Sequence, residues 1–219
     1  MSYTIAIDGY SACGKSTLAR AMARQLNYRF VDTGAMYRMV TLHFLRENVD
    51  LEDAAAVSAA LAGVSIDFAP GSNHALLNGQ DVEREIRSME VSNYVSPVAA
   101  VSAVRRAIVP LQQKIGEHGG VVMDGRDIGT VVFPNADLKL FVTAALDTRV
   151  DRRLAELQAA GKHPLRQEVT ANLLERDHID STRADSPLRQ ADDAIVLDNT
   201  DLSLEEFIAA GMREVHQLG

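Results

Sequence analysis

The residues with the clearest chemistry lie near the start of the chain, where glycine, four residues and Gly-Lys-Ser follow one another. This spacing is typical of a phosphate-binding loop, in which glycines let the backbone wrap a phosphate with its N–H groups turned inward. Lys15 has the reach for the β- and γ-phosphates, and Ser16 is suited to ligate Mg²⁺. Cys13 is interpreted as a small residue of the loop. The predicted ATP-binding residues are Gly9, Tyr10, Ser11, Ala12, Cys13, Gly14, Lys15, Ser16 and Thr17.

A phosphate-binding loop alone is shared by GTPases, motors and small kinases. Guanine-selective GTPases usually carry an Asn-Lys-x-Asp segment, which this sequence lacks, and 219 residues are few for a motor. The loop therefore favours a small kinase.

A second group of polar residues follows two further apolar runs. The segment 32–38 reads Asp-Thr-Gly-Ala-Met-Tyr-Arg and opens a predicted helix, which Thr33 is expected to cap. The segment 124–130 reads Asp-Gly-Arg-Asp-Ile-Gly-Thr and follows another buried run, with Asp124 placed to hold Mg²⁺ through water. Ligands gather at the carboxyl ends of parallel strands, so both segments are expected near the phosphate-binding loop. A surface arginine and a solvated charged loop are the plainer alternatives.

Cations are concentrated towards the C-terminal third of the chain. Residues 149–189 hold 8 of the 22 Lys and Arg residues. On a helix, Arg176, Asp180 and Arg183 share one face, because they are four and three residues apart. The plain interpretation is an exposed, salt-bridged helix, and the sharper one is a cationic flap that closes over phosphates.

The hydrophobic pattern predicts elements that place these residues. Apolar runs predict parallel strands over 3–8, 28–32, 120–123, 138–142 and 194–197. Helical periodicity covers 16–26, 34–48, 51–62, 147–160, 170–183 and 203–218. Residues 64–86 predict a small antiparallel insertion, because Asn78-Gly79 between extended segments favours a hairpin. A helical stretch is predicted to run, with interruptions, from 89 to 117. It contains Pro110, where a kink or break is expected. The predicted fold class is α/β, with five parallel strands and helices on both faces.

The composition argues against some classes of binding partner. The net charge is −8, which argues against a non-specific binder of polymeric nucleic acid or of membranes. Its 22 cations divide into 18 Arg and 4 Lys, and arginine is the side chain whose planar fork matches phosphate. The single cysteine, the absence of a signal segment and the lack of a long apolar run predict a soluble cytoplasmic protein.

Taken together, these motifs resemble those of bacterial cytidylate kinases, which phosphorylate CMP and dCMP. The resemblance covers essentially the whole chain and is most specific in 124–134. It implies a nucleoside monophosphate kinase fold with a core at about 1–63, 87–148 and 186–219. An NMP-binding insertion is expected at about 64–86 and a helical lid at about 149–185.

The resemblance also implies residue roles. Phosphate is expected to be bound by Arg38, Arg126, Arg176 and Arg183. The cytosine edge is expected to face Ser96, Arg105 and Asp127, with the ribose on Asp180 and the acceptor site lined by Thr33 and Tyr37. The expected catalytic residues are Lys15, Arg126, Arg176 and Arg183.

The sequence departs from the family at Ile179, where some members carry an additional arginine, and at Pro110. The implied reaction is Mg²⁺-dependent transfer of phosphate from ATP to CMP or dCMP by a monomer. Alternatives are a small kinase for UMP, dTMP or dephospho-coenzyme A, and a non-catalytic nucleotide-sensing module.

Overall fold

The computed structural model describes residues 2–70 and 72–218, which form two compact units. The first unit comprises residues 2–32, 113–182 and 186–218. The described residues of the second lie within 33–112 and 183–185. No helix within the described residues has both the length and the apolar content needed to cross a membrane.

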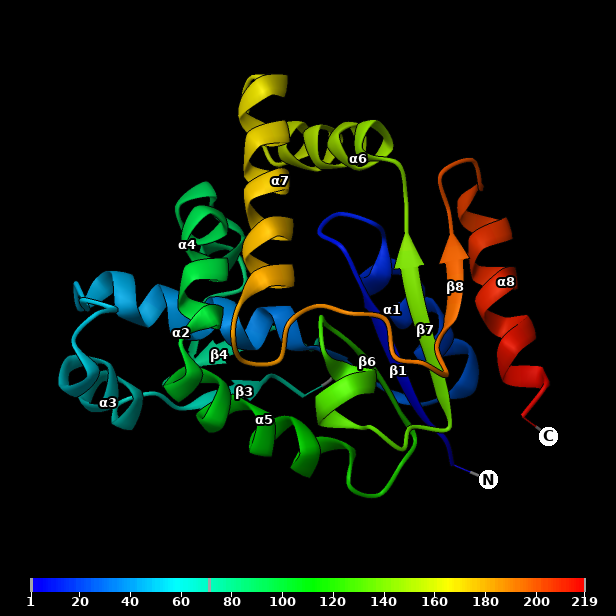
Figure 1. Cartoon of the computed structure of the whole chain (residues 1–219), viewed down its shortest axis with the longest axis horizontal. Coiled ribbons are helices and arrows are strands. Elements are labelled where there is room, and N and C mark those ends of the chain that lie inside the picture. Colours follow the sequence, from blue (N-terminus) through cyan, green and yellow to red (C-terminus); the bar gives the residue numbers. More distant parts are fainter. Residues whose placement is uncertain (1, 71, 219) are drawn as a thin grey trace. The chain divides into compact units, whose positions relative to one another are not determined.

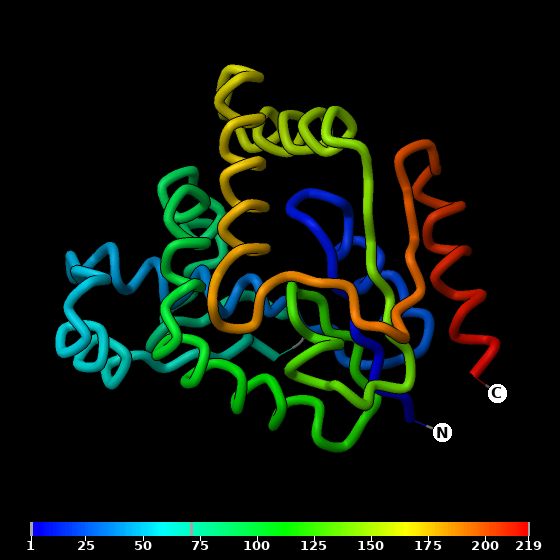
Figure 2. Tube along the Cα trace, in the orientation of Figure 1, coloured from blue at the N-terminus to red at the C-terminus, as the bar shows by residue number. Residues whose placement is uncertain are grey.

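The first unit is built on a sheet of five parallel strands in the order β2-β6-β1-β7-β8. The strands are β1 (Thr4–Gly9), β2 (Arg29–Asp32), β6 (Val121–Asp124), β7 (Leu138–Thr143) and β8 (Ile195–Asp198). Although it begins the chain, β1 is the central strand, and Ile5 and Ile7 are fully buried. Figure 2 follows the chain from this strand, in blue, to the C-terminal helix, in red. The parallel arrangement brings the carboxyl ends of β1, β2 and β6 to one edge, which confirms the predicted fold class.

Helices flank this sheet (Figure 1). They are α1 (Lys15–Leu26), α6 (Leu146–Ala159), α7 (Arg166–Thr182) and α8 (Leu204–His216). A capping box of Ser203 and Glu206 starts α8 where the sequence predicts it. The helix then packs on α1 through Gly211, where a Cβ atom would stand 2.9 Å from Leu18 Cδ1. Two more helices, α6 and α7, contact each other beyond the end of β7.

The second unit combines helices with a small antiparallel sheet. Its elements are α2 (Thr33–Arg46), α3 (Ala54–Ala62), β3 (Ile66–Phe68), β4 (Ala75–Leu77), β5 (Gln80–Asp81), the 3₁₀ turn η1 (Glu85–Arg87), α4 (Met89–Ala100) and α5 (Ser102–Gly116). The last four residues of α5 belong to the first unit. Asn78 and Gly79 form the tight turn between β4 and β5, and both have positive φ, as the hairpin prediction requires. Contacts of α2 with α4, η1 and β4 hold the unit together.

Three local expectations differ from the structure. Of the kink or break expected at Pro110, the break is wrong, because α5 continues through that residue. The helical stretch is interrupted, as predicted, but at Val101. Val101 is extended, with ψ of 115°, so the helix stops there whatever lies downstream. The helix predicted from residue 51 begins at Ala54, since the Asp53 carboxylate accepts the N–H groups of Ala55 and Ala56. Thr33 is the first residue of α2, not the residue that caps it.

A fourth difference concerns the charged segment after β6. Residues 128–132 form a π-helical turn, η2 (Ile128–Val132), which packs against β1. The apolar residues Ile128 and Val132 of this turn are buried. The plainer alternative, a solvated charged loop, is therefore wrong for residues 128–132, which form a compact turn on the central strand.

Candidate active site

The loop between β1 and α1 has the backbone that a phosphate-binding loop needs. Gly9 has φ of 144°, and a Cβ atom there would stand 2.1 Å from the Val142 carbonyl oxygen, so only glycine fits. Gly14, at the start of α1, has φ of 90°. Between them Ala12 also adopts positive φ, at 59°, which is strained for a residue with a side chain. The loop ends at the N-terminus of α1, where anions are favoured.

Lys15 is folded over this loop. Its side chain is buried, and Nζ donates to the Tyr10 carbonyl oxygen at 2.5 Å and lies 3.7 Å from Cys13 Sγ. Burial, followed by the nearby charge of Arg126, lowers the pKa of Lys15. An ammonium group desolvated in this way gains more from an arriving phosphate than it would in water.

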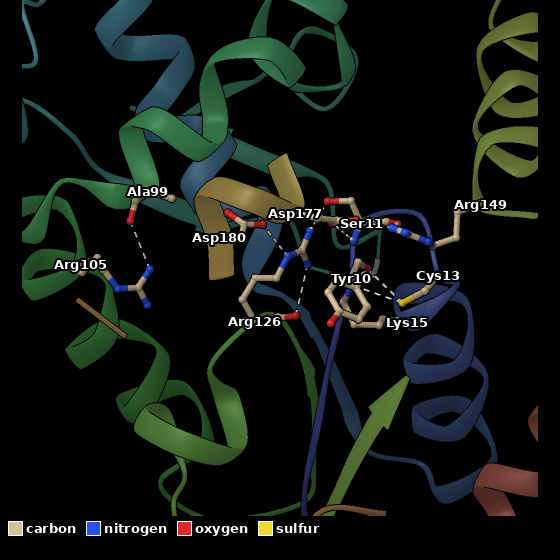
Figure 3. A network of polar contacts seen from close by, with 11 residues as sticks. Tyr10, Ser11, Cys13, Lys15, Ala99, Arg105, Arg126, Arg149, Asp177 and Asp180 are labelled. Atoms are coloured by element: carbon tan, nitrogen blue, oxygen red, sulfur yellow. Dashed lines mark hydrogen bonds and ion pairs between the residues drawn. The ribbon is translucent and has the colours of Figure 1, made fainter. Parts of the chain in front are cut away.

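Arg126 joins the segment after β6 to both the loop and α7 (Figure 3). Its Nη2 donates to Ser11 Oγ at 2.9 Å, and its Nε donates to the Asp180 carboxylate at 2.8 Å. Burial alone would lower the pKa of Arg126, but the charge and hydrogen bond of Asp180 raise it overall. The guanidinium is thus held as a fixed cation at the apex of the loop.

A second arginine also joins the loop to α7, through different atoms of the loop and a different carboxylate. Arg149, on α6, donates through Nη1 to the Ser11 carbonyl oxygen at 3.2 Å and to the Asp177 carboxylate of α7. Asp177 in turn accepts the N–H of Ser11 at 3.0 Å. The guanidinium of Arg149 also lies 5.4 Å from the centre of the Tyr10 ring. The apex of the loop is therefore braced by one side chain from each of these two helices.

Arg176 and Arg153 bring further positive charge to this unit. Burial, then the charge of Arg126, lowers the pKa of Arg176 to about 10, and Arg153 acts in the same direction. Within the described part of the chain, Arg176 Nε and Arg153 Nη2 are buried without a hydrogen-bond partner. Cations whose buried donor atoms are unused are the arrangement that a polyanion satisfies.

Ser16 and Asp124, predicted to hold a metal ion, are in direct contact: Ser16 Oγ donates to Asp124 Oδ2 at 2.7 Å. Asp124 is buried and stands in register with Asp32 on the neighbouring strand. Burial, then the charge of Asp32, raises the pKa of Asp124 to about 7. A hydroxyl beside two crowded carboxylates fits Mg²⁺, which accepts oxygen ligands and would relieve their repulsion. The described residues contain no cluster of three His, Cys, Asp or Glu side chains able to hold a metal unaided.

Most of the other predicted acceptor residues belong to the second unit. Arg105 is 2% exposed; its Nη1 donates to the Ala99 carbonyl oxygen at 3.3 Å and its guanidinium lies 5.3 Å from the centre of the Tyr37 ring. Arg38 is buried and donates to the Ile86 carbonyl oxygen at 3.1 Å. Buried positions are also taken by Thr33, Ser96 and Arg183. Asp127, expected to read the same base edge, is buried in the first unit.

The helix-face prediction for Arg183 stays a prediction, because α7 ends one residue before it. The helix α7 ends at Thr182, so Arg183 follows it and is grouped with the second unit, whereas Arg176 and Asp180 are buried on α7 itself.

The family model of cytidylate kinases matches residues 5–217 of the chain. The chain belongs to the cytidylate kinase family. It is 51% identical over 210 residues to the cytidylate kinase of Phocaeicola vulgatus, covering 93% of this chain and 92% of that protein. It is 49% identical to the cytidylate kinases of Parabacteroides distasonis, covering 97% of this chain and 96% of that protein, and of Flavobacterium johnsoniae, covering 98% and 96%.

Solved structures share the fold at low sequence identity. The shikimate kinase of Bacteroides thetaiotaomicron is similar with a TM-score of 0.50 and 12% identity, covering 99% of both chains. An uncharacterized protein from Eubacterium ventriosum is similar with a TM-score of 0.53 and 12% identity, covering 99% of both chains. These likenesses concern the fold alone.

Several residues around the phosphate-binding loop of this cytidylate kinase family member escaped prediction. Asn199 is 1% exposed and its Nδ2 donates to the Cys13 carbonyl oxygen at 2.8 Å, while Arg152 donates to Asn199 Oδ1 at 2.8 Å. Arg149 and Asp177 brace the loop apex. The available signal was the run of arginines at the start of α6 and the carboxylate next to Arg176. Neither pattern indicates which backbone groups such side chains contact.

Proposed function

We propose that the protein transfers the γ-phosphate of ATP to CMP or dCMP and releases ADP and CDP or dCDP. The observation that carries this proposal is the match of the cytidylate kinase family over residues 5–217. The geometry of the first unit supports it, because a phosphate-binding loop, Lys15 and buried arginines surround one polar region. A pure sensor of nucleotides has no need of buried cations beyond those that bind one triphosphate.

In this proposal no general base is required, because the attacking phosphate of a nucleoside monophosphate is largely ionised at neutral pH. The main obstacle is repulsion between two polyanions. Arginine forks offset that repulsion and stabilise the charge of the transferred group. Arg126 and Arg176 serve this purpose in the first unit, and Arg183 and Arg38 bind the acceptor phosphate. Lys15 follows the donor phosphates, so that catalysis consists mainly of positioning.

We propose Ser16 and Asp124 as the residues that hold Mg²⁺, Asp124 through water. The ion would supply positive charge that neutralises the donor phosphates. The same proposal includes the residues that contact the rest of the acceptor. They are Ser96, Arg105 and Asp127 at the cytosine edge, Asp180 at the ribose, and Thr33 and Tyr37 in the acceptor site. So are an NMP-binding insertion near 64–86, a lid near 149–185, a cytoplasmic location and a monomeric state.

The test is ADP release with CMP, dCMP, UMP, dUMP, AMP and dTMP as acceptors. We expect CMP to be preferred over UMP at least about tenfold, because UMP leaves a buried acceptor unpaired at a cost of about 1–3 kcal/mol. Equal rates with both would overturn the proposed base recognition. Arg183→Ala should lower turnover by orders of magnitude in a folded protein, and wild-type turnover of that variant would refute the role given to Arg183.

A further inference from the structure

Asp8 is a buried carboxylate whose two oxygens accept hydrogen bonds from a segment far away in the sequence. It lies on β1 directly before Gly9 and is 5% exposed. Oδ1 accepts the N–H of Ile128 at 2.8 Å, and Oδ2 accepts the N–H of Gly129 at 2.7 Å. Both bonds are buried and span about 120 residues of sequence.

These two N–H groups open the π-helical turn η2. The first N–H groups of any helical turn lack partners within it, and a carboxylate satisfies them well. Gly125, near the other end of the same segment, donates its N–H to the Ile7 carbonyl oxygen at 2.9 Å. Consecutive residues of β1, Ile7 and Asp8, thus hold the segment 125–129 at both ends.

Two predicted site residues, Arg126 and Asp127, lie between these two attachments. Arg126 contacts Ser11 of the phosphate-binding loop, which itself begins at Gly9, the residue after Asp8. The end of β1 is therefore a common frame for the loop and for Arg126. A shift of η2 along β1 would move Arg126 relative to the loop.

Burial makes the ionised form of Asp8 energetically costly. Burial raises the pKa of Asp8 to about 6, although the two N–H donors oppose that rise; Asp127 adds to it and Lys15 counteracts it. An asparagine of the same shape would avoid the burial of charge. It offers one acceptor oxygen, and its NH₂ group would face one of the two N–H groups. Only a carboxylate presents an acceptor to each.

We propose that Asp8 is a positioning residue of the phosphotransfer reaction. By accepting the N–H groups of Ile128 and Gly129, it fixes Arg126 and Asp127 relative to the phosphate-binding loop. The inference rests on the proposed function, since its effect on rate is measured with CMP as acceptor.

Asp8→Asn tests the proposal, with Asp53→Asn as the matched control. Asp53 also accepts two backbone N–H groups at the start of a helix, those of Ala55 at 2.8 Å and Ala56 at 3.1 Å, but it is exposed and far along the chain. We expect Asp8→Asn to lower kcat roughly 10- to 100-fold, since small misplacements have effects of that size. Its KM for ATP should stay within about threefold of wild type and its thermal midpoint should be equal or higher. Asp53→Asn should keep wild-type kcat.

Hydrogen exchange gives a readout that does not depend on catalysis. The amides of Ile128 and Gly129 should exchange slowly in the wild type and faster in Asp8→Asn, with little change elsewhere. Wild-type kcat in Asp8→Asn would overturn the proposal. A loss of kcat that merely follows a lowered thermal midpoint would overturn it too, because that outcome indicates a structural role.

The two proposals fail in distinguishable ways. A wild type that phosphorylates no acceptor refutes the proposed function. Exchange at Ile128 and Gly129 then still tests the attachment of η2 to Asp8: unchanged protection in Asp8→Asn refutes the attachment, whereas lost protection supports the attachment without a role in phosphotransfer.

Discussion

The substitution Arg149→Met tests how strongly α6 and α7 hold the apex of the phosphate-binding loop. Arg149 is 7% exposed, and the side chain of its partner Asp177 is 12% exposed. Methionine keeps the apolar stem but removes the donors to Asp177, to the Ser11 carbonyl oxygen and to the Ala144 carbonyl oxygen. Asp177 then keeps only the N–H of Ser11 among these partners.

The expected cost follows from that burial. Removing one partner of a buried ion pair costs about 3–5 kcal/mol, because the other charge stays behind without its partner. For a chain of this size, each kcal/mol lowers the thermal midpoint by about 2–4 °C, so we expect a fall of roughly 6–20 °C. The KM for ATP should rise as well, since Ser11 loses its brace. Calorimetry and steady-state kinetics measure the two effects.

A double-mutant cycle with Asp177→Asn isolates the pair. The double variant should lose about 1–3 kcal/mol less than the sum of the single variants, because neither charge is then left alone. Arg166→Met is the control: Arg166 joins the same two helices through the exposed Asp147 and Asp151, and water screens those pairs. Its midpoint should stay close to wild type. Additive single costs, or an equal loss in Arg166→Met, would refute the reasoning.

Three further predictions concern the loop and its carboxylates. As pH rises from about 4 to about 6, the nucleotide-free protein should lose stability through Asp8. The pKa of Asp8 in the folded state is raised to about 6, above the unfolded value of 3.8, so the unfolded state gives up the proton at lower pH than the folded state does. Denaturant titrations at pH 4.5 and 7 should show wild type losing about 2 kcal/mol relative to Asp8→Asn, and a constant difference would contradict this. Asp124→Asn should raise the thermal midpoint of the metal-free protein, because it removes a carboxylate whose pKa is raised by burial and by Asp32. The same variant should show a smaller increase of the thermal midpoint when Mg²⁺ and ATP are added. An undiminished increase would exclude Asp124 from the metal site. Gly9→Ala should abolish ATP binding in a thermal-shift assay, because its Cβ would meet the Val142 carbonyl oxygen at 2.1 Å, while Gly161→Ala, with positive φ but open space, should bind normally.

The elements with strong hydrophobic periodicity were predictable from the sequence. All five strands of the parallel sheet and the capped start of α8 lie within a residue or two of the predicted positions, because their signals are local. The position of the stop, at Val101, and the passage of α5 through Pro110 were not predictable. Proline removes one hydrogen bond, and whether a helix survives that loss depends on what packs around it.

The π-helical turn after β6 shows the same limit. Its residues read as a charged loop with glycines, whereas Ile128 and Val132 are buried and the turn lies on β1. Its first N–H groups are satisfied by Asp8, about 120 residues earlier. No local pattern predicts a bond over that separation.

The sequence by itself determined the fold class, the phosphate-binding loop and the residue types of the site, because those depend on spacing within single segments. Tertiary structure alone decided which groups hold the loop: Arg149 and Asp177 at Ser11, Asn199 at Cys13, and Asp8 at the start of η2. These contacts join segments far apart in the chain, and they form only once the parallel sheet has brought the ends of its strands to one edge. Burial at that edge then sets the pKa values of Asp8 and Asp124, since desolvation is a property of the packed protein and not of the residue.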